Sequence, residues 1–281
     1  MNLNYFLEVL ENHFPTKYAL PDDRIGLQVH TGKLEIENLL VVYEVTYDIL
    51  KECVLNNIDT IISFHPLIFH PLMQISQEDR VGKIITSLLK NNISVISLHT
   101  RFDVFKYGTS FLFGQEIGLD FDHFLVPNIQ DENFGMGIVG NFKDSIDLNT
   151  LLNKIYSITK NPIRYSKTNR KTIKKIGIVG GSGMSFMKYA IENELDAFIT
   201  ADTTYHQYHQ YQDKIVLIDP GHYETEQFIV PALAKFLKQT FEQEAINIIP
   251  SQQITNPINY YPNLTENENK IEINNNKIEM V

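Results

Sequence analysis

The sequence predicts an α/β protein with a largely parallel sheet, organised either as one large domain or as two intertwined lobes. Short apolar runs rich in β-branched residues alternate with segments of helical periodicity. The apolar runs are continuous, which is typical of strands buried on both faces of a sheet. Alternation of such strands with helices indicates a layered α/β fold. With 281 residues, 43% of them hydrophobic, the chain can form a sizeable core.

The predicted strands and helices follow one another along the chain. The first helix covers MNLNYFLEVLENHFP, where apolar residues recur at helical spacing. We expect strands at 39–45, 60–64, 94–98, 176–179, 197–200 and 215–218. We expect further helices at 47–56, 80–91, 148–159, 184–194 and 224–238.

The segment 121–170 interrupts this alternation and marks the start of a second lobe. Its glycines favour a connection that contains some antiparallel strand. We therefore expect a first lobe over 1–120, completed by 223–262, and a second lobe over 121–222. The end of the chain, 263–281, is rich in Asn, Glu and Lys, which is typical of a disordered tail.

Composition excludes several classes of protein. The formal net charge is −10, from 24 Lys and Arg against 34 Asp and Glu, so nucleic-acid binding is disfavoured. A single cysteine excludes a disulfide framework and a cysteine-rich zinc module, and it fits a reducing compartment. The chain has no signal-peptide pattern at its start and no apolar run of the ~18–20 residues that a membrane helix needs. We therefore expect a cytoplasmic protein without a membrane partner.

Histidines and carboxylates gather just after predicted strands, where open α/β sheets bind their ligands. In DPGHYETE (219–226), Gly221 permits a tight turn and the residues after it favour a helix. His222 and Glu226 then lie on one helical face, four residues apart. Such a pair can bind one metal ion or bridge two. The alternative is a solvated first turn whose Glu favours the helix N-terminus.

Two strand ends in the first half of the chain carry further candidate ligands. In SFHPLIF, Pro66 ends the strand and holds His65 at the end of the sheet. In LHTRFD, Asp103 offers an oxygen ligand and His99 a partner that orients it. Each has an ordinary alternative. His65 can be a core histidine bonded to a backbone carbonyl, and Asp103 can be a helix cap or turn residue.

Three other features have simpler readings. In ADTTYHQYH, Asp202 and His206 are candidate site residues, or else a capping aspartate and an exposed helical histidine. IGIVGGSGM (176–184) lacks the spacing of a dinucleotide-binding loop and of a Walker motif, so its glycines more simply permit a sharp strand-to-helix turn. Cys53 lies in an apolar helix, where packing explains it better than nucleophilic catalysis.

Taken in order, these motifs resemble those of the NGG-one-interacting-factor-three-like family, known in bacteria as GTP cyclohydrolase I type two homologues. The motifs are IGLQV, IISFHPLIF, HTRFD, GGSG, TADTTYH and DPGHYETE. The resemblance extends from residue 1 to about 261. It implies two interleaved α/β lobes with mixed sheets, a dinuclear metal centre and a toroidal homohexamer. By position it implies that His65, Asp103, His222 and Glu226 are metal ligands, with Glu226 bridging the two ions.

Two positions depart from the family pattern. The family has two consecutive histidines before the proline, but here the first of them is Phe64. The resemblance implies that this histidine and His222 serve one ion, whereas His65 and Asp103 serve the other. Phe cannot bind a metal, so the site of His65 and Asp103 keeps its ligands while the other site loses one. Arg101 stands where the family usually has Asn, and a cation there would compete with metal or bind an anionic substrate.

The sequence supports two functions. The first is a metal-dependent hydrolase that acts on an anionic small molecule, a nucleotide or a phosphorylated compound, through metal-activated water. His206 or His99 would serve as general acid or base. Nitrogen and oxygen ligands without thiolate suit Zn, Mn, Fe, Ni or Mg, one or two ions per chain. The second function is a non-catalytic metal-binding or scaffold hexamer with a degenerate, mononuclear site, which Phe64 favours.

Overall fold

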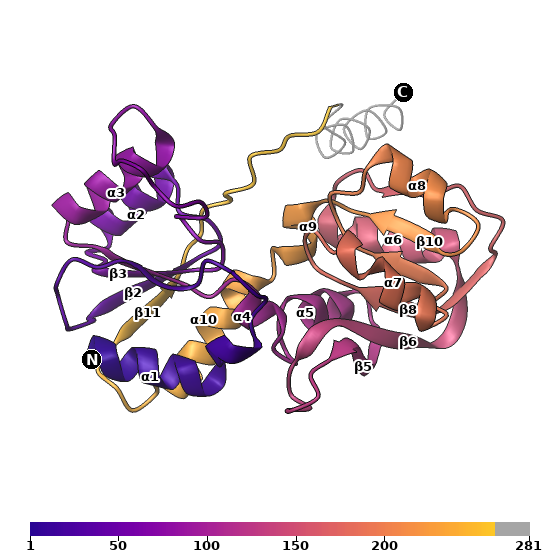
Figure 1. Ribbon diagram of the computed structural model, residues 1–281, viewed down its shortest axis with the longest axis horizontal. Coiled ribbons are helices and arrows are strands. Elements are labelled where there is room, and N and C mark those ends of the chain that lie inside the picture. Colours follow the sequence, from indigo (N-terminus) through magenta and orange to yellow (C-terminus); the bar gives the residue numbers. More distant parts are fainter. Residues whose placement is uncertain (262–281) are drawn as a thin grey trace, which may run out of the picture. The chain divides into compact units, whose positions relative to one another are not determined.

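The computed structural model describes residues 1–261, and the chain folds into two compact units (Figure 1). Unit 1 comprises 1–112, 126–137 and 227–255. Unit 2 comprises 113–125, 138–226 and the described residues from 256 onward. Each unit is therefore assembled from separate stretches of the chain. The tail expected over 263–281 lies outside the described residues.

Unit 1 contains a five-stranded sheet in the order β1-β4-β3-β2-β11. Strands β4, β3, β2 and β11 are parallel, whereas β1 pairs antiparallel with β4 at the edge. The apolar runs of β3 and β4 are buried throughout, because helices cover both faces of the sheet. The strands are β1 (Gly26–Val29), β2 (Asn38–Val42), β3 (Thr60–Ser63), β4 (Ser94–Ser97) and β11 (Asn247–Pro250).

The helices of unit 1 lie on both faces of its sheet (Figure 1). Apolar residues of α2 and α3 pack against Leu40 and Val95 of the strands in one core. On the other face, Phe6 of α1 stacks on Phe241 after α10, with ring centroids 5.0 Å apart. The elements are α1 (Leu3–His13), η1 (Thr16–Tyr18), α2 (Tyr47–Leu55), α3 (Arg80–Lys90), α4 (Thr100–Asp103) and α10 (Ile229–Thr240).

Unit 2 contains most of a six-stranded sheet in the order β5-β6-β8-β9-β10-β7. Strands β8, β9 and β10 are parallel, whereas β6 pairs antiparallel with β8 and β7 with β10. The predicted mixed α/β fold is confirmed, although this sheet is less parallel than expected. The strands are β5 (Asp120–Pro127), β6 (Gly135–Asp147), β7 (Arg164–Tyr165), β8 (Thr172–Ile178), β9 (Ala197–Ile199) and β10 (Val216–Asp219). The helices are α5 (Thr109–Glu116), α6 (Leu148–Thr159), η2 (Met184–Phe186), α7 (Met187–Glu192), α8 (Tyr205–Tyr211) and α9 (His222–Glu226).

Two predicted elements that carry or adjoin candidate residues differ in the structure. The helix expected over 224–238 is two helices, α9 and α10, because Pro231 has no N–H with which to extend the helical hydrogen bonds backwards. The strand expected over 39–45 ends at Val42, so Glu44 lies in the turn that follows β2. Both differences matter for the candidate ligands, since His222 and Glu226 lie on the short separate helix and Glu44 contacts His65.

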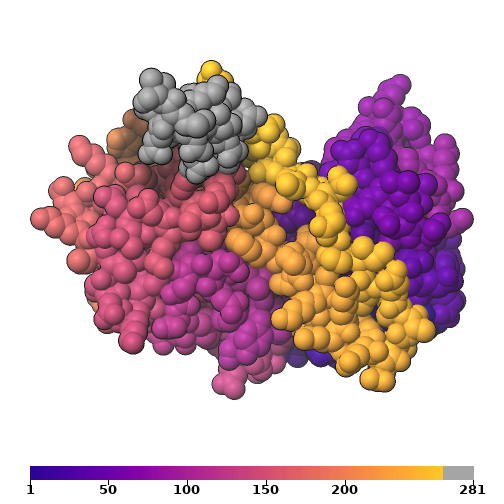
Figure 2. All heavy atoms as spheres, turned by 180° about the vertical axis from the view of Figure 1, so that it is seen from behind, coloured from indigo at the N-terminus to yellow at the C-terminus, as the bar shows by residue number. Residues whose placement is uncertain are grey.

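The surface carries the C-terminal part of the described chain, shown in yellow in Figure 2. Ile254 in this part is 79% exposed.

Over residues 1–261, no helix has both the length and the apolar character required to cross a membrane.

Candidate metal centre

In unit 2, the candidate ligands lie on α9, directly after β10. Gly221 adopts φ +107°, a conformation that glycine reaches without strain, and turns the chain from the strand into the helix. His222 Nε2 then lies 3.1 Å from Glu226 Oε2, one helical turn away. The His222 side chain is 30% exposed and that of Glu226 only 4%. A ring nitrogen and a carboxylate oxygen at this spacing can share one metal ion.

Asp202 fixes the orientation of the His222 ring. Its Oδ2 lies 2.6 Å from His222 Nδ1, and the Ser182 hydroxyl donates to the same oxygen. Burial alone would lower the pKa of His222, but the hydrogen bonds to Asp202 and Glu226 outweigh burial and raise it to about 10. The hydrogen bond with His222 lowers the pKa of Asp202 to about 2. A histidine whose Nδ1 meets a carboxylate, with Nε2 directed at the ligand position, is typical of metal sites.

Gly181 leaves the space that this pair occupies. A Cβ built on Gly181 would lie 2.4 Å from Glu226 Oε1 and 3.1 Å from His222 Nε2. The Gly181 N–H also donates to Thr225 Oγ1 at 2.9 Å, which attaches the glycine-rich turn to α9. The GGSG motif therefore does more than permit a sharp turn, because it lets the backbone approach the candidate ligands closely.

A buried carboxylate holds the opposite face of α9. Glu224 is 1% exposed, and its Oε1 accepts hydrogen bonds from Asn161 Nδ2 at 2.6 Å and Asn256 Nδ2 at 3.0 Å. Burial raises the pKa of Glu224. Because residues two apart point to opposite sides of a helix, this anchoring directs His222 and Glu226 to the other side.

In unit 1, His65 follows β3 and contacts the turn after β2. Its Nδ1 lies 3.2 Å from Glu44 Oε2, and its ring centroid lies 4.6 Å from that of Tyr43. Arg80 Nη2 donates to the other Glu44 oxygen at 3.0 Å. Burial opposes ionisation of Glu44, but its contacts with His65 and Arg80 prevail and lower its pKa. His65 is therefore oriented by a carboxylate and not, as its ordinary alternative requires, by a backbone carbonyl alone.

His99 stands beside His65 and is oriented by Asp23. The two ring centroids are 5.6 Å apart, and His99 Nδ1 lies 2.6 Å from Asp23 Oδ1. Asp23 Oδ2 accepts hydrogen bonds from the Thr100 N–H at 3.1 Å and the Thr100 hydroxyl at 2.5 Å. These contacts outweigh burial and lower the pKa of Asp23 to about 2. The sequence suggested Asp103 as the partner of His99 and missed Asp23, whose one signal is its position two residues before the IGLQV segment.

The other predicted site residues have separate environments. Asp103 ends α4, and its Oδ1 accepts a hydrogen bond from Thr109 Oγ1 at 2.5 Å. His206 lies on the exposed surface of α8, with its ring centroid 5.5 Å from that of Tyr205. The four predicted metal ligands divide between the units, with His65 and Asp103 in unit 1 and His222 and Glu226 in unit 2.

Phe64 occupies the position of the missing histidine and is fully buried. Its ring stacks on Tyr43 at 5.9 Å between centroids and meets the rings of His65 and His99 at 4.9 and 5.8 Å. The Phe64 side chain thus packs among aromatic rings at the position where the family pattern has a histidine.

The prediction for Arg101, a cation facing metal or substrate, is wrong. Arg101 is 4% exposed. Its guanidinium donates to the carbonyls of Phe14 at 2.5 Å and Leu10 at 3.2 Å, and to the Glu11 carboxylate at 2.9 Å. These groups lie at the C-terminal end of α1, where the Leu10 carbonyl also accepts from the Phe14 N–H at 2.8 Å and the last carbonyls lack further partners within the helix. Arg101 therefore caps α1.

We expect Arg101→Leu to lower the free energy of unfolding by about 2–4 kcal/mol, because buried carbonyls would lose charged donors. Denaturant unfolding of the metal-free protein measures this change. Arg101→Lys restores one charged donor and should recover part of the loss. An unfolding midpoint unchanged in Arg101→Leu would contradict the capping role.

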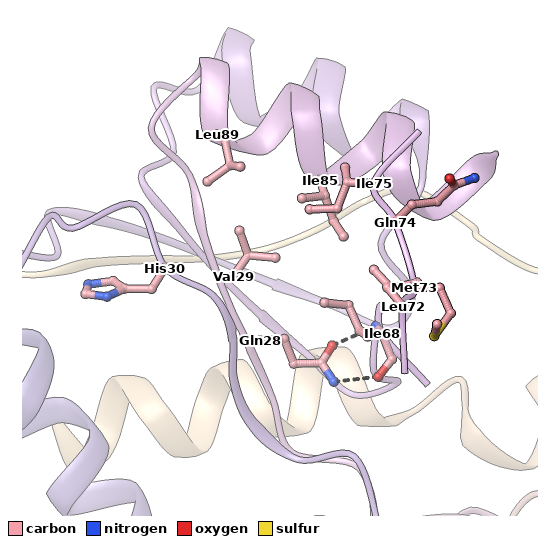
Figure 3. A pocket seen from close by; sticks show the side chains of 10 residues that line it. All are labelled: Gln28, Val29, His30, Ile68, Leu72, Met73, Gln74, Ile75, Ile85 and Leu89. Carbon is pink, nitrogen blue, oxygen red and sulfur yellow. Dashed lines mark hydrogen bonds between the residues drawn. The ribbon is translucent and has the colours of Figure 1, made fainter. Parts of the chain in front are cut away.

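A separate pocket in unit 1 is lined by none of the predicted site residues. It has a volume of about 440 Å³ and lies between β1, α3 and the segment that precedes α3 (Figure 3). Gln28 of β1 fastens that segment, since its Nε2 donates to the Ile68 carbonyl at 3.1 Å and its Oε1 accepts from the Ile68 N–H at 2.9 Å. The rest of the lining is mostly aliphatic, including Val29, Leu72 and Ile85.

Comparison with known proteins identifies relatives along most of the chain. The sequence pattern of the Duf34/NIF3 (NGG1p interacting factor 3) family matches residues 1–257. Two proteins named GTP cyclohydrolase 1 type 2 homolog are similar. That of Clostridium acetobutylicum is 28% identical over 257 residues, which is 90% of this chain and 96% of that protein. That of Lactococcus lactis subsp. lactis is 30% identical over 263 residues, which is 92% of this chain and 98% of that protein.

Solved structures show the same fold. The crystal structure of Staphylococcus aureus hypothetical protein SA1388 superposes with a TM-score of 0.86 at 24% identity, covering 92% of this chain and 99% of that one. The resemblance inferred from the motifs is therefore confirmed, and the chain belongs to the Duf34/NIF3 family.

Proposed function

We propose that the protein binds one or two divalent metal ions and that His65, Asp103, His222 and Glu226 are the ligands. We propose further that it hydrolyses an anionic small molecule, a nucleotide or a phosphorylated compound. The observation that carries the proposal is the 3.1 Å approach of His222 Nε2 and Glu226 Oε2, beside the space left by Gly181. The name shared by the relatives, GTP cyclohydrolase 1 type 2 homolog, supports a nucleotide as the substrate class.

The donor set fits a divalent ion. It offers imidazole nitrogen and carboxylate oxygen without thiolate, which suits Zn, Mn, Fe, Ni or Mg. A bound ion would lower the pKa of a water molecule and polarise an oxygen of the substrate. Asp202 holds His222 in one ring orientation, and Glu226 supplies negative charge beside it. His99, held by Asp23 through Nδ1, or His206 on α8 would transfer the proton.

Metal binding at His222 should release a proton. The pKa of about 10 means that the metal-free imidazole is protonated at neutral pH, whereas a metal ligand must be neutral. Since this pKa is raised, the proton is held through neutral pH and lost only as pH approaches 10. The apparent affinity should therefore rise about tenfold per pH unit from neutral pH upward. Calorimetric titration with Zn²⁺ in buffers of different ionisation enthalpy counts the released protons. Asp202→Asn removes one of the two carboxylates that raise the pKa of His222, so this variant should release fewer protons.

Elemental analysis of the reconstituted protein, counted per chain, tests the proposal. Glu226→Ala should lose the metal, because it removes a carboxylate that is 4% exposed beside His222. Glu192→Ala on α7 is the matched control, since the Glu192 side chain is 54% exposed and pairs with Lys188. Wild-type protein that holds no metal would refute the proposal. Metal-dependent hydrolysis of nucleotides, absent in Glu226→Ala, then tests the catalytic part.

A second candidate function is a non-catalytic scaffold that assembles as a homohexamer and holds one metal ion or none. The burial of Phe64 at a ligand position favours it. Light scattering before and after chelation separates the two functions. Assembly that survives chelation, in a protein without hydrolytic activity, would support the scaffold.

For either function we propose that the protein is cytoplasmic, where the buried thiol of Cys53 stays reduced.

A further inference from the structure

Unit 1 holds two imidazoles side by side, and only one of them belongs to the ligand set above. We propose that His99 is also a metal ligand and binds the same ion as His65. This inference rests on the proposed function, because it adds a ligand to the proposed site. It replaces the general acid–base role considered for His99.

The spacing of the two rings suits a shared ion. Their centroids are 5.6 Å apart and their planes are inclined by 71°. Two imidazoles bound to one tetrahedral ion, with metal–nitrogen distances of about 2.0–2.1 Å, have centroids about 5 Å apart. A shift of a few tenths of an ångström therefore brings His65 and His99 into joint coordination. The side chains are 19% and 20% exposed, so an ion can reach both.

Each ring also has the carboxylate partner that metal-binding histidines commonly have. Glu44 lies 3.2 Å from Nδ1 of His65, and Asp23 lies 2.6 Å from Nδ1 of His99. Both rings would then coordinate through Nε2. Asp23 is itself held by two hydrogen bonds from Thr100, so the orientation of the His99 ring is fixed from behind.

The backbone of His99, the N-cap residue of α4, is strained. His99 adopts φ +40° and ψ −123°, which is unfavourable for a residue with a side chain. Such a conformation costs of order 1–3 kcal/mol and persists where the surroundings enforce it, often at functional sites. Here the His99 N–H donates to the Phe64 carbonyl at 2.9 Å, which ties the strained residue to the strand end that carries His65.

The apolar residue at position 64 lies beside the proposed ligand pair. The Phe64 ring meets the His99 ring at 5.8 Å, so the nitrogen that His99 adds from the end of β4 serves the ion of His65 and leaves the other ion without its missing ligand. A site with both His65 and His99 would be rich in imidazole. Such a site selects zinc, nickel or iron over magnesium.

Zinc binding to the full chain tests the inference without any assay of activity. Affinity is measured by competition with a chromophoric chelator, and X-ray absorption at the zinc edge counts the imidazole ligands. The variants are His99→Asn, Asp23→Asn and His65→Asn, with His30→Asn as an exposed control of unit 1. His99→Asn should lose one imidazole from the zinc spectrum and bind zinc at least about 100-fold more weakly, as His65→Asn does. Asp23→Asn should keep the imidazole count and bind about 10- to 100-fold more weakly.

The outcomes separate this inference from the proposed function. A wild-type imidazole count and affinity in folded His99→Asn would overturn the role of His99 and leave the proposed metal site intact. Failure of the wild-type chain to bind zinc would overturn both. If His99→Asn does not fold, the decision falls to Asp23→Asn, where unchanged zinc affinity overturns the inference.

Discussion

Replacement of Gly181 by Ala should weaken metal binding by more than about 100-fold. This is at least as large as the greatest loss expected when a residue that orients a metal ligand is removed. The added methyl group would lie 2.4 Å from Glu226 Oε1 and 3.1 Å from His222 Nε2, so both ligands would have to move. Alanine at φ +60° also costs about 1–2 kcal/mol of conformational strain. Zinc affinity and denaturant unfolding, measured on the same preparation, separate the two effects.

Gly32→Ala is the control for this experiment. Gly32 has φ +88° and no atom within 4 Å of a Cβ built on it, so the substitution brings strain without a collision. It should lower stability and leave the affinity for zinc unchanged. Equal loss of affinity in the two variants would mean that Gly181 acts through general destabilisation and not through the space beside the ligands.

Phe64→His should raise the metal content by about one ion per chain, because it restores a nitrogen donor beside His65. The same change should lower the stability of the metal-free protein by about 2–4 kcal/mol, because a polar ring replaces a fully buried apolar one. Elemental analysis and denaturant unfolding, each with and without metal, measure the two effects. Metal should recover much of the lost stability.

Phe64→Leu provides the matched comparison. It removes the aromatic contacts with Tyr43 and His99 but introduces no donor. It should therefore be destabilised without gaining metal. An unchanged metal content in Phe64→His would sink the idea that this position accounts for the missing ligand.

Most strand and helix positions could be predicted from the sequence, because buried parallel strands leave continuous apolar runs. The helix over 148–159 matches α6 at both ends, where Asp147 caps the first turn by accepting from the Thr150 N–H. The break between α9 and α10 was missed, although Pro231 signalled it.

Only some of the contacts around the candidate metal ligands could be predicted from the sequence. Local spacing places His222 and Glu226 together, because both lie on one helical turn. Contacts between distant segments leave no such pattern. Asp23 is 76 residues from His99, and the sequence alone gives no reason to pair them. The error over Arg101 has the same origin, since its partners on α1 lie about 90 residues away, as the 90-residue separation from Glu11 shows.

The two aspartates that orient His99 and His222 have a practical consequence for handling the protein. Asp23 and Asp202 both have a pKa of about 2, so each remains a carboxylate, still holding its histidine, in mildly acidic buffer. Acid at about pH 4 would therefore displace metal by protonating the ring nitrogens, while the two aspartates stay ionised and keep their contacts with the histidines. Stripping by acid dialysis should be reversible, and the emptied protein should take up metal again on neutralisation without a refolding step.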